Sequence, residues 1–67
     1  MQHFEDGTFY APDDKALRFI ATVGTLRLWR CKGRGPAFFK IRNRVMYRGE
    51  DLNAWLADQR VVPGEAA

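Results

Sequence analysis

The stretch Gly33-Arg34-Gly35-Pro36 is a break between a segment with the periodicity of a helix and one with the periodicity of strands. Before the break, Leu26 and Trp29 have the spacing of residues on one face of a helix. Thr22 precedes them, and threonine is a residue type that favours helix N-caps. The first glycine of the break can take the left-handed conformation that follows a helix, and its proline cannot continue one. These signals predict a helix over residues 23–32.

Beyond the break, residues 39–48 alternate between apolar and cationic side chains, apart from Met46, on both sides of a polar tip that contains Asn43. Alternation with a period of two is typical of strands, and asparagine tolerates the positive φ of tight turns. The pattern therefore predicts a β-hairpin with a cationic face toward solvent. The face expected to pack against the helices consists of Phe39, Ile41, Val45 and Tyr47.

Two further helices are expected on either side of these elements. Pro12 and the two aspartates after it suit the first turn of a helix over about 12–20. Leu52 and Leu56 lie on one apolar stripe of a helix that runs from Gly49 to about Arg60. The expected fold class is α+β, mainly α: a small winged helix-turn-helix of three helices, with a two-stranded β-hairpin wing between the second and third.

With 67 residues, the chain is short enough to form one domain only. We expect a flexible N-terminal segment over 1–11, in which Phe9-Tyr10 makes a short extended piece. The winged helix-turn-helix domain is expected over 12–60, and a C-terminal tail over 61–67.

Few residues of this chain suit catalysis or metal binding. It has one cysteine, Cys31, one histidine, His3, and no serine. These counts argue against a disulfide, a structural metal and a Ser-His-Asp triad. We expect no enzymatic activity, no metal and no cofactor. The short apolar runs and the N-terminal residues indicate neither a membrane span nor a secretory signal, so a cytoplasmic location is expected.

Positive charge is concentrated in the middle of the chain. Residues 27–48 contain eight Lys and Arg and no acid, whereas residues 1–26 carry a net charge of −2 and residues 49–67 one of −3. Such a block repels itself, and a polyanionic partner is the simplest explanation. The alternative is a solvated basic surface without a partner.

Three stretches of the sequence resemble one known family. They are Thr25-Leu26-Arg27-Leu28-Trp29-Arg30, Gly33-Arg34-Gly35-Pro36 with Phe38 and Lys40 after it, and Asp51-Leu52-Asn53-Ala54-Trp55-Leu56 after Val45 and Tyr47. They are similar to the excisionase and AlpA-type members of the MerR-like winged helix-turn-helix group, which are small bacterial and phage DNA-binding proteins. The chain departs from the family at Arg42, where the hairpin tip usually carries a glycine. It also departs in the turn before residue 25, where the family usually carries a glycine and a serine and this chain has Ile20 and Gly24 near those places.

The resemblance implies that the helix over 23–32 enters the major groove of duplex DNA and that the wing lies along the backbone or in a minor groove. The implied contacts of this helix are Thr22, Val23, Gly24, Thr25, Arg27, Leu28 and Arg30. Those of the loop and the wing are Lys32, Arg34, Lys40, Arg42, Asn43 and Arg44. Arg27 suits a bidentate pair with guanine, and threonine hydroxyls suit phosphate. Arg48 has two interpretations, a DNA contact or a salt bridge to Glu50 or Asp51.

The expected partner is double-stranded DNA. The resemblance implies an excisionase-like recombination directionality factor, which binds tandem sites with self-association, bends DNA and steers a tyrosine integrase toward excision. The alternative is an AlpA-like transcriptional regulator. A further alternative is the DNA-recognition or protein-interaction arm of a packaging or integration complex. Either way, a bacterial or phage-encoded protein of the nucleoid is implied.

Overall fold

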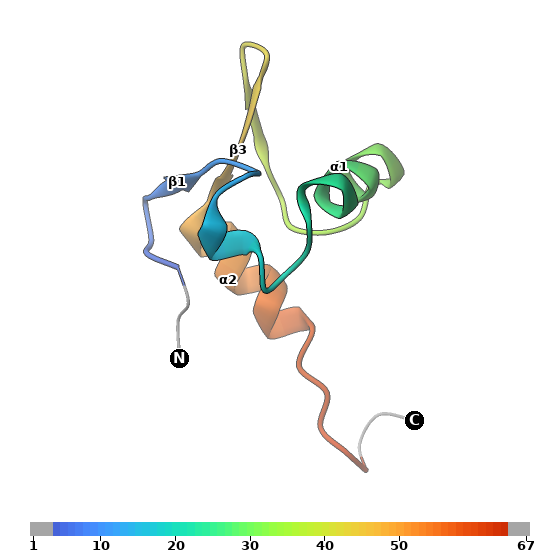
Figure 1. Cartoon of the computed structure of the whole chain (residues 1–67). Coiled ribbons are helices and arrows are strands. Elements are labelled where there is room, and N and C mark those ends of the chain that lie inside the picture. The colour runs from blue at the N-terminus through green and yellow to red at the C-terminus, as the bar shows by residue number, and fades with distance from the viewer. Residues whose placement is uncertain (1–3, 65–67) are drawn as a thin grey trace.

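The computed structural model describes residues 4–64; expectations for residues 1–3, which include His3, and for 65–67, the end of the tail, lie outside it. In chain order, the elements are β1 (Phe9–Tyr10), the 3-10 turn η1 (Lys15–Leu17), α1 (Val23–Lys32), β2 (Phe39–Ile41), β3 (Arg44–Arg48) and α2 (Gly49–Asp58). Figure 1 shows β2 and β3 as a hairpin whose tip projects away from both helices.

The described residues form a small α+β fold with two α-helices and one three-stranded antiparallel sheet, in the order β1-β3-β2. The prediction of a winged helix-turn-helix with three helices and a two-stranded wing is therefore wrong. Figure 1 makes both differences visible, because only a short turn precedes α1 and a strand from the N-terminal side joins the hairpin.

The helix predicted over 12–20 shrinks to the single turn η1 because Asp14 acts as its cap. Asp14 has an extended backbone (φ −61°, ψ 135°), and its Oδ1 accepts a hydrogen bond from the Ala16 N–H at 2.8 Å. Local bonds of this kind compete with helical hydrogen bonding. Thr22 is extended as well and begins the next helix. The stretch between the two caps is too short to offset the cost of helix nucleation.

The bounds of α1 agree with the prediction over 23–32. Its N-cap Thr22 accepts a hydrogen bond from the Thr25 N–H at 3.2 Å, and Gly33 ends the helix in the left-handed conformation with φ 69°. Gly35 then packs on Trp29, where a Cβ would lie 2.8 Å from a carbon of the indole ring. The glycines of the break therefore end α1 and let the chain turn closely around its tryptophan.

The third strand comes from the segment that the sequence analysis treated only as extended. β1 pairs antiparallel with the end of β3, with Phe9 opposite Arg48 and Tyr10 opposite Tyr47. The Gly49 N–H continues this contact with a hydrogen bond of 2.8 Å to the Thr8 carbonyl oxygen. Residues 8–10, which lie in the segment expected to be flexible, are thus built onto the sheet.

The faces of the hairpin differ from the prediction. A two-residue turn joins the strands, so Ile41 lies opposite Arg44 and Lys40 opposite Val45. Residues directly opposite each other share a face, and odd positions of β2 therefore share a face with even positions of β3. The predicted apolar face, which joined odd positions of both strands, is wrong. Val45 and Tyr47 face inward, whereas Ile41 lies on the opposite face and is 51% exposed.

The core joins the N-terminal segment, η1, α1, β3 and α2. Its buried members are Phe4, Leu17, Leu26, Tyr47 and Leu52. Phe4 is only 3% exposed, although it belongs to the segment expected to precede the domain. Asn53 of α2 holds it from both sides: Oδ1 accepts from the Phe4 N–H at 3.2 Å, and Nδ2 donates to the Phe4 carbonyl at 2.8 Å.

The second helix, α2, ends at Asp58 and not near Arg60, and its apolar stripe packs as predicted around the buried Leu52. Its Trp55 ring lies 5.4 Å from the ring of Trp29, which ties α2 to α1. Neither helix within residues 4–64 has the length and apolar content needed to cross a bilayer.

Candidate nucleic-acid interface

The first two turns of α1 present one open face to solvent. Leu26 is fully buried beneath this face, and Arg27 and Leu28 are exposed next to it, Leu28 by 50%. The predicted contacts that are exposed here are Thr22, Val23, Gly24, Arg27 and Leu28, and Thr25 is half-buried. The helix can therefore offer several of these side chains to a ligand without loss of its core contact.

The two threonines at the start of α1 divide their hydroxyl groups between two tasks. Thr22 Oγ1 accepts from the Thr25 N–H and donates to Thr25 Oγ1 at 3.1 Å. The hydroxyl of Thr22 is thus engaged in starting the helix. Thr25 keeps its own hydroxyl proton for an external acceptor such as a phosphate oxygen.

Arg30 differs from the other predicted contacts because its side chain turns inward. Its Nη1 donates to the Tyr47 hydroxyl at 2.7 Å, and its guanidinium carbon lies 5.9 Å from the ring centroids of both Tyr47 and Phe38. Cation–π contacts of this length are attractive. Arg30 therefore anchors α1 to β3 across the interior of the fold.

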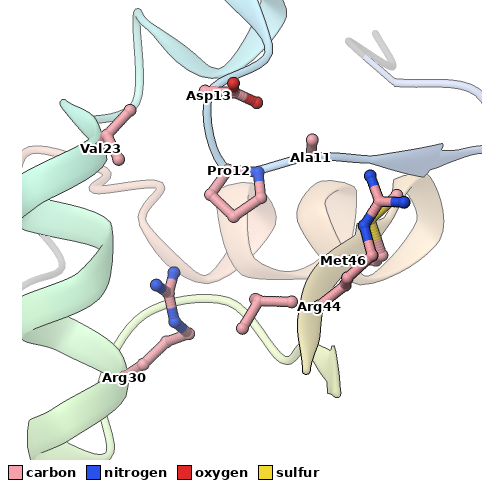
Figure 2. Close-up of a pocket in the computed structure, with 8 residues that line it drawn as sticks. Ala11, Pro12, Asp13, Val23, Arg30, Arg44 and Met46 are labelled. Atoms are coloured by element: carbon pink, nitrogen blue, oxygen red, sulfur yellow. The ribbon is translucent and has the colours of Figure 1, made fainter. Parts of the chain in front are cut away.

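Two hollows open between α1 and the hairpin, on either side of this anchor. The larger, of about 410 Å³, has Arg30 on one side and Arg44 and Met46 on the other, with Pro12 between them (Figure 2). The smaller, of about 280 Å³, places Arg27 of α1 and Lys40 of β2 on its walls together with Arg30. Helix and hairpin thus line a hollowed surface that carries positive charge from both, and Asp13 adds one acid to the wall of its larger hollow.

The tip of the hairpin consists of Arg42 and Asn43, both exposed. The positive φ that the sequence analysis expected at Asn43 occurs at Arg42, with φ 57°. Glycine is the residue that adopts this left-handed conformation most readily. The arginine accepts some backbone strain and places a cation at the outermost point of the hairpin.

The remaining two predicted contacts follow the C-terminal end of α1. Lys32 is the last residue of the helix, and Arg34 lies in the break behind it, and both are exposed. Cations are stabilised near the negative end of the helix dipole. They widen the basic surface at the end of α1 that lies opposite Thr22.

Arg48 belongs to the fold and not to this surface. Its Nε lies 3.3 Å from Glu50 Oε1 and 3.9 Å from Asp51 Oδ2, and its guanidinium covers the ring of Phe39 at 5.0 Å. Of the two interpretations of Arg48, the salt bridge is therefore the one that the geometry gives. All ion pairs within residues 4–64 involve Arg48.

Six predicted cations are therefore exposed and have no ion-pair partner within the described part of the chain. They are Arg27, Lys32, Arg34, Lys40, Arg42 and Arg44. The same part of the chain holds no cluster of three or more His, Cys, Asp or Glu side chains placed for a metal ion. Unpaired positive charge of this kind attracts negatively charged ligands.

Sequence reasoning missed the exposure of Ile41, which lies beside the hairpin tip on the face opposite Val45. The length of the hairpin turn fixes the register and would have revealed this exposure. Met46, on the outward face of β3, lines the larger hollow.

No protein-family model, curated protein or solved structure matches this chain.

Proposed function

We propose that this chain binds double-stranded DNA in a sequence-specific manner, with α1 in the major groove and the β2–β3 hairpin along the backbone or in an adjacent minor groove. The observation that carries the proposal is the hollowed surface on which Arg27 of α1 and Lys40 of β2 share one hollow. A single polyanion lying across this surface would meet cations from both elements at once.

The shape and chemistry of α1 support a role in reading bases. A helix fits the major groove of B-form DNA, and an arginine there can donate two hydrogen bonds to the O6 and N7 of guanine. Arg27 is exposed on the free face of α1, one position after the fully buried Leu26. The core contact thus fixes the helix while the neighbouring arginine stays available for base contacts.

The number of free cations sets an expected salt dependence. Six exposed cations lie on α1, the break and the hairpin. If about four to six of them neutralise phosphates, log K falls with log salt at a slope near −4 to −5. Binding through apolar or neutral contacts alone would give a slope near zero.

A finer role is proposed from the resemblance of the sequence to excisionases. In this role the protein acts in the bacterial cytoplasm, at the nucleoid, as a recombination directionality factor. It binds tandem DNA sites, bends the DNA and steers a tyrosine integrase toward excision. One module covers a short site, so tandem copies supply the specificity that one copy lacks. Stimulation of integrase-dependent excision in a purified system supports this role, whereas an effect only on a promoter reporter favours the AlpA-like regulator.

The experiment that tests DNA binding compares two arginine variants on specific and non-specific duplexes. We expect Arg27→Ala to weaken binding to the specific site more than to the non-specific one, because it removes a base contact. Arg44→Ala should weaken both alike, because it removes a phosphate contact. Equal losses on both duplexes for Arg27→Ala would refute its base-reading role. Absence of duplex binding by the folded wild-type chain would refute the proposed function.

A further inference from the structure

An exposed apolar side chain lies beside the hairpin tip, outside the hydrophobic core of the described residues. Ile41 is the last residue of β2 and lies directly opposite Arg44, the first of β3. It is 51% exposed and does not belong to the core or to the partly buried residues packed against it. The residues around it are polar: Lys40 precedes it, and Arg42 and Asn43 form the turn.

The other exposed apolar residues near the basic surface are fixed differently. The ring of Phe38 lies 6.3 Å from that of Tyr47 and 5.9 Å from the Arg30 guanidinium, so it is held against the body of the fold. Val23 and Leu28 lie on α1, among the contacts proposed for the major groove. Ile41 alone sits beside the tip of the hairpin, which Figure 1 shows projecting away from the rest of the fold.

We propose that Ile41 acts as a wedge that enters the DNA minor groove, inserts partly between two stacked base pairs and kinks the duplex. The inference rests on the proposed function and adds to it a residue and a mechanism for bending. Isoleucine is among the side chains that unstack base steps in this way, and bends of about 20–90° result. No covalent step is involved.

The neighbours of Ile41 provide cations and a hydrogen-bond donor that would hold the hairpin tip in a minor groove. Arg44 shares its face of the hairpin, and Arg42 stands at the turn with a left-handed backbone, so cations flank the apolar side chain on two sides. Arginine is drawn to the negative potential of a narrow minor groove. Asn43 can bond the hydrogen-bond acceptors that A·T pairs present there. The two-residue turn keeps the tip slim enough to approach the groove.

A wedge of this kind also has a preferred target. Pyrimidine–purine steps such as TA and CA are the easiest to unstack and kink. We therefore expect the hairpin to settle at such a step near the bases that α1 contacts. Specificity at this step would arise from deformability and not from hydrogen bonds.

The test measures the bend of the bound duplex by energy transfer between dyes at its two ends, with 2-aminopurine at the candidate step to report unstacking. Ile41→Thr keeps the β-branch but removes the apolar end, and we expect it to lose roughly half or more of the wild-type bend and the 2-aminopurine signal. The salt slope of binding should not change, because no cation is lost. Ile41→Met should retain the bend, because methionine is also a wedge residue.

The matched control is Val61→Thr, since Val61 is 70% exposed and follows α2, away from the hairpin. This variant should bend DNA as the wild type does. The variants at positions 41 and 61 should all have the melting temperature of the wild-type protein, because both positions lie outside the core. An unchanged bend in Ile41→Thr overturns the wedge, and so does a wild-type complex in which the DNA is straight. Either result leaves the proposed function, duplex binding, standing. A wild-type chain that binds no duplex overturns the proposed function and the wedge together.

Discussion

Removing one buried hydroxyl tests the link between α1 and the hairpin. Tyr47 is a core residue, and its hydroxyl accepts the 2.7 Å hydrogen bond from Arg30 Nη1. Tyr47→Phe keeps the ring in the core and deletes this acceptor. Hydrogen bonds to charged groups contribute about 1.5–3 kcal/mol when well enclosed. Arg30 is only half-buried, so water replaces part of the bond. We therefore expect a loss of about 1 kcal/mol, below the lower end of that range.

A loss of this size is easily measured in so small a domain. Stabilities of about 0.05–0.15 kcal/mol per residue give roughly 3–10 kcal/mol for this chain. In a domain of this length, 1 kcal/mol corresponds to about 4–8 °C in melting temperature. The matched control is Tyr10→Phe, which deletes an exposed bond of 3.1 Å from the Glu5 N–H. We expect this control to melt closer to the wild type, because solvent competes for the exposed bond.

The same variants separate a positioning role of Arg30 from a contact with DNA. If Arg30 only holds α1 against β3, then Tyr47→Phe and Arg30→Met both weaken duplex binding without changing the salt slope. A drop of about 0.9 in the magnitude of the slope for Arg30→Met would show that Arg30 neutralises a phosphate. That drop, or an unchanged melting temperature in Tyr47→Phe, would refute the role of Arg30 as an inward-held anchor.

Three further predictions concern the backbone. Gly49→Ala should destabilise the fold by more than about 1–3 kcal/mol in chemical denaturation, because its Cβ would overlap the Glu5 carbonyl group, a backbone contact that cannot rotate away. Gly24→Ala is its control: nothing lies within 4 Å of the new Cβ, and the helix should gain about 0.5–1 kcal/mol. Thr22→Ala should cost about 1 kcal/mol in the same assay through loss of the N-cap. Arg42→Gly should raise the melting temperature by relieving a positive φ, yet lower the magnitude of the salt slope by about 0.9.

The helical part of the fold was predictable where both ends carried a signal. Thr22 and Gly33 mark the two ends of α1, and the structure uses both as caps. The segment after Pro12 carried a start signal of the same kind. However, the Asp14 side chain accepts a hydrogen bond from the Ala16 N–H, and the helix is limited to one turn. The sequence alone does not distinguish an aspartate inside the first turn of a helix from one at the N-cap of the helix. The choice depends on the backbone conformation at that residue.

The hairpin was predictable as an element but not in its faces. Each strand alternates correctly by itself, and the turn length decides which face of one strand joins which face of the other. The two-residue turn pairs Ile41 with Arg44 and leaves the isoleucine in solvent. The core contribution of Phe4 was also invisible, because it depends on Asn53, which lies far along the chain.

For the candidate site, the sequence predicted which residue types are present but not which of their side chains are turned inward. The charge block marked the cations, and six of them are exposed as a ligand surface requires. Arg27 and Arg30 lie three positions apart on one helix and look alike in sequence. Only the contact between Arg30 and Tyr47 separates them, and these two residues meet through the fold.

The most direct test of the account is the salt dependence of duplex binding by the intact chain, followed by fluorescence anisotropy of a labelled duplex that carries the protein's preferred site. Six exposed cations on α1, the break and the hairpin predict a slope of log K against log salt near −4 to −5. The same slope should shrink in magnitude by about 0.9 in Arg44→Ala, because one phosphate contact is lost. A slope near zero, or no binding by a correctly folded chain, would contradict the account.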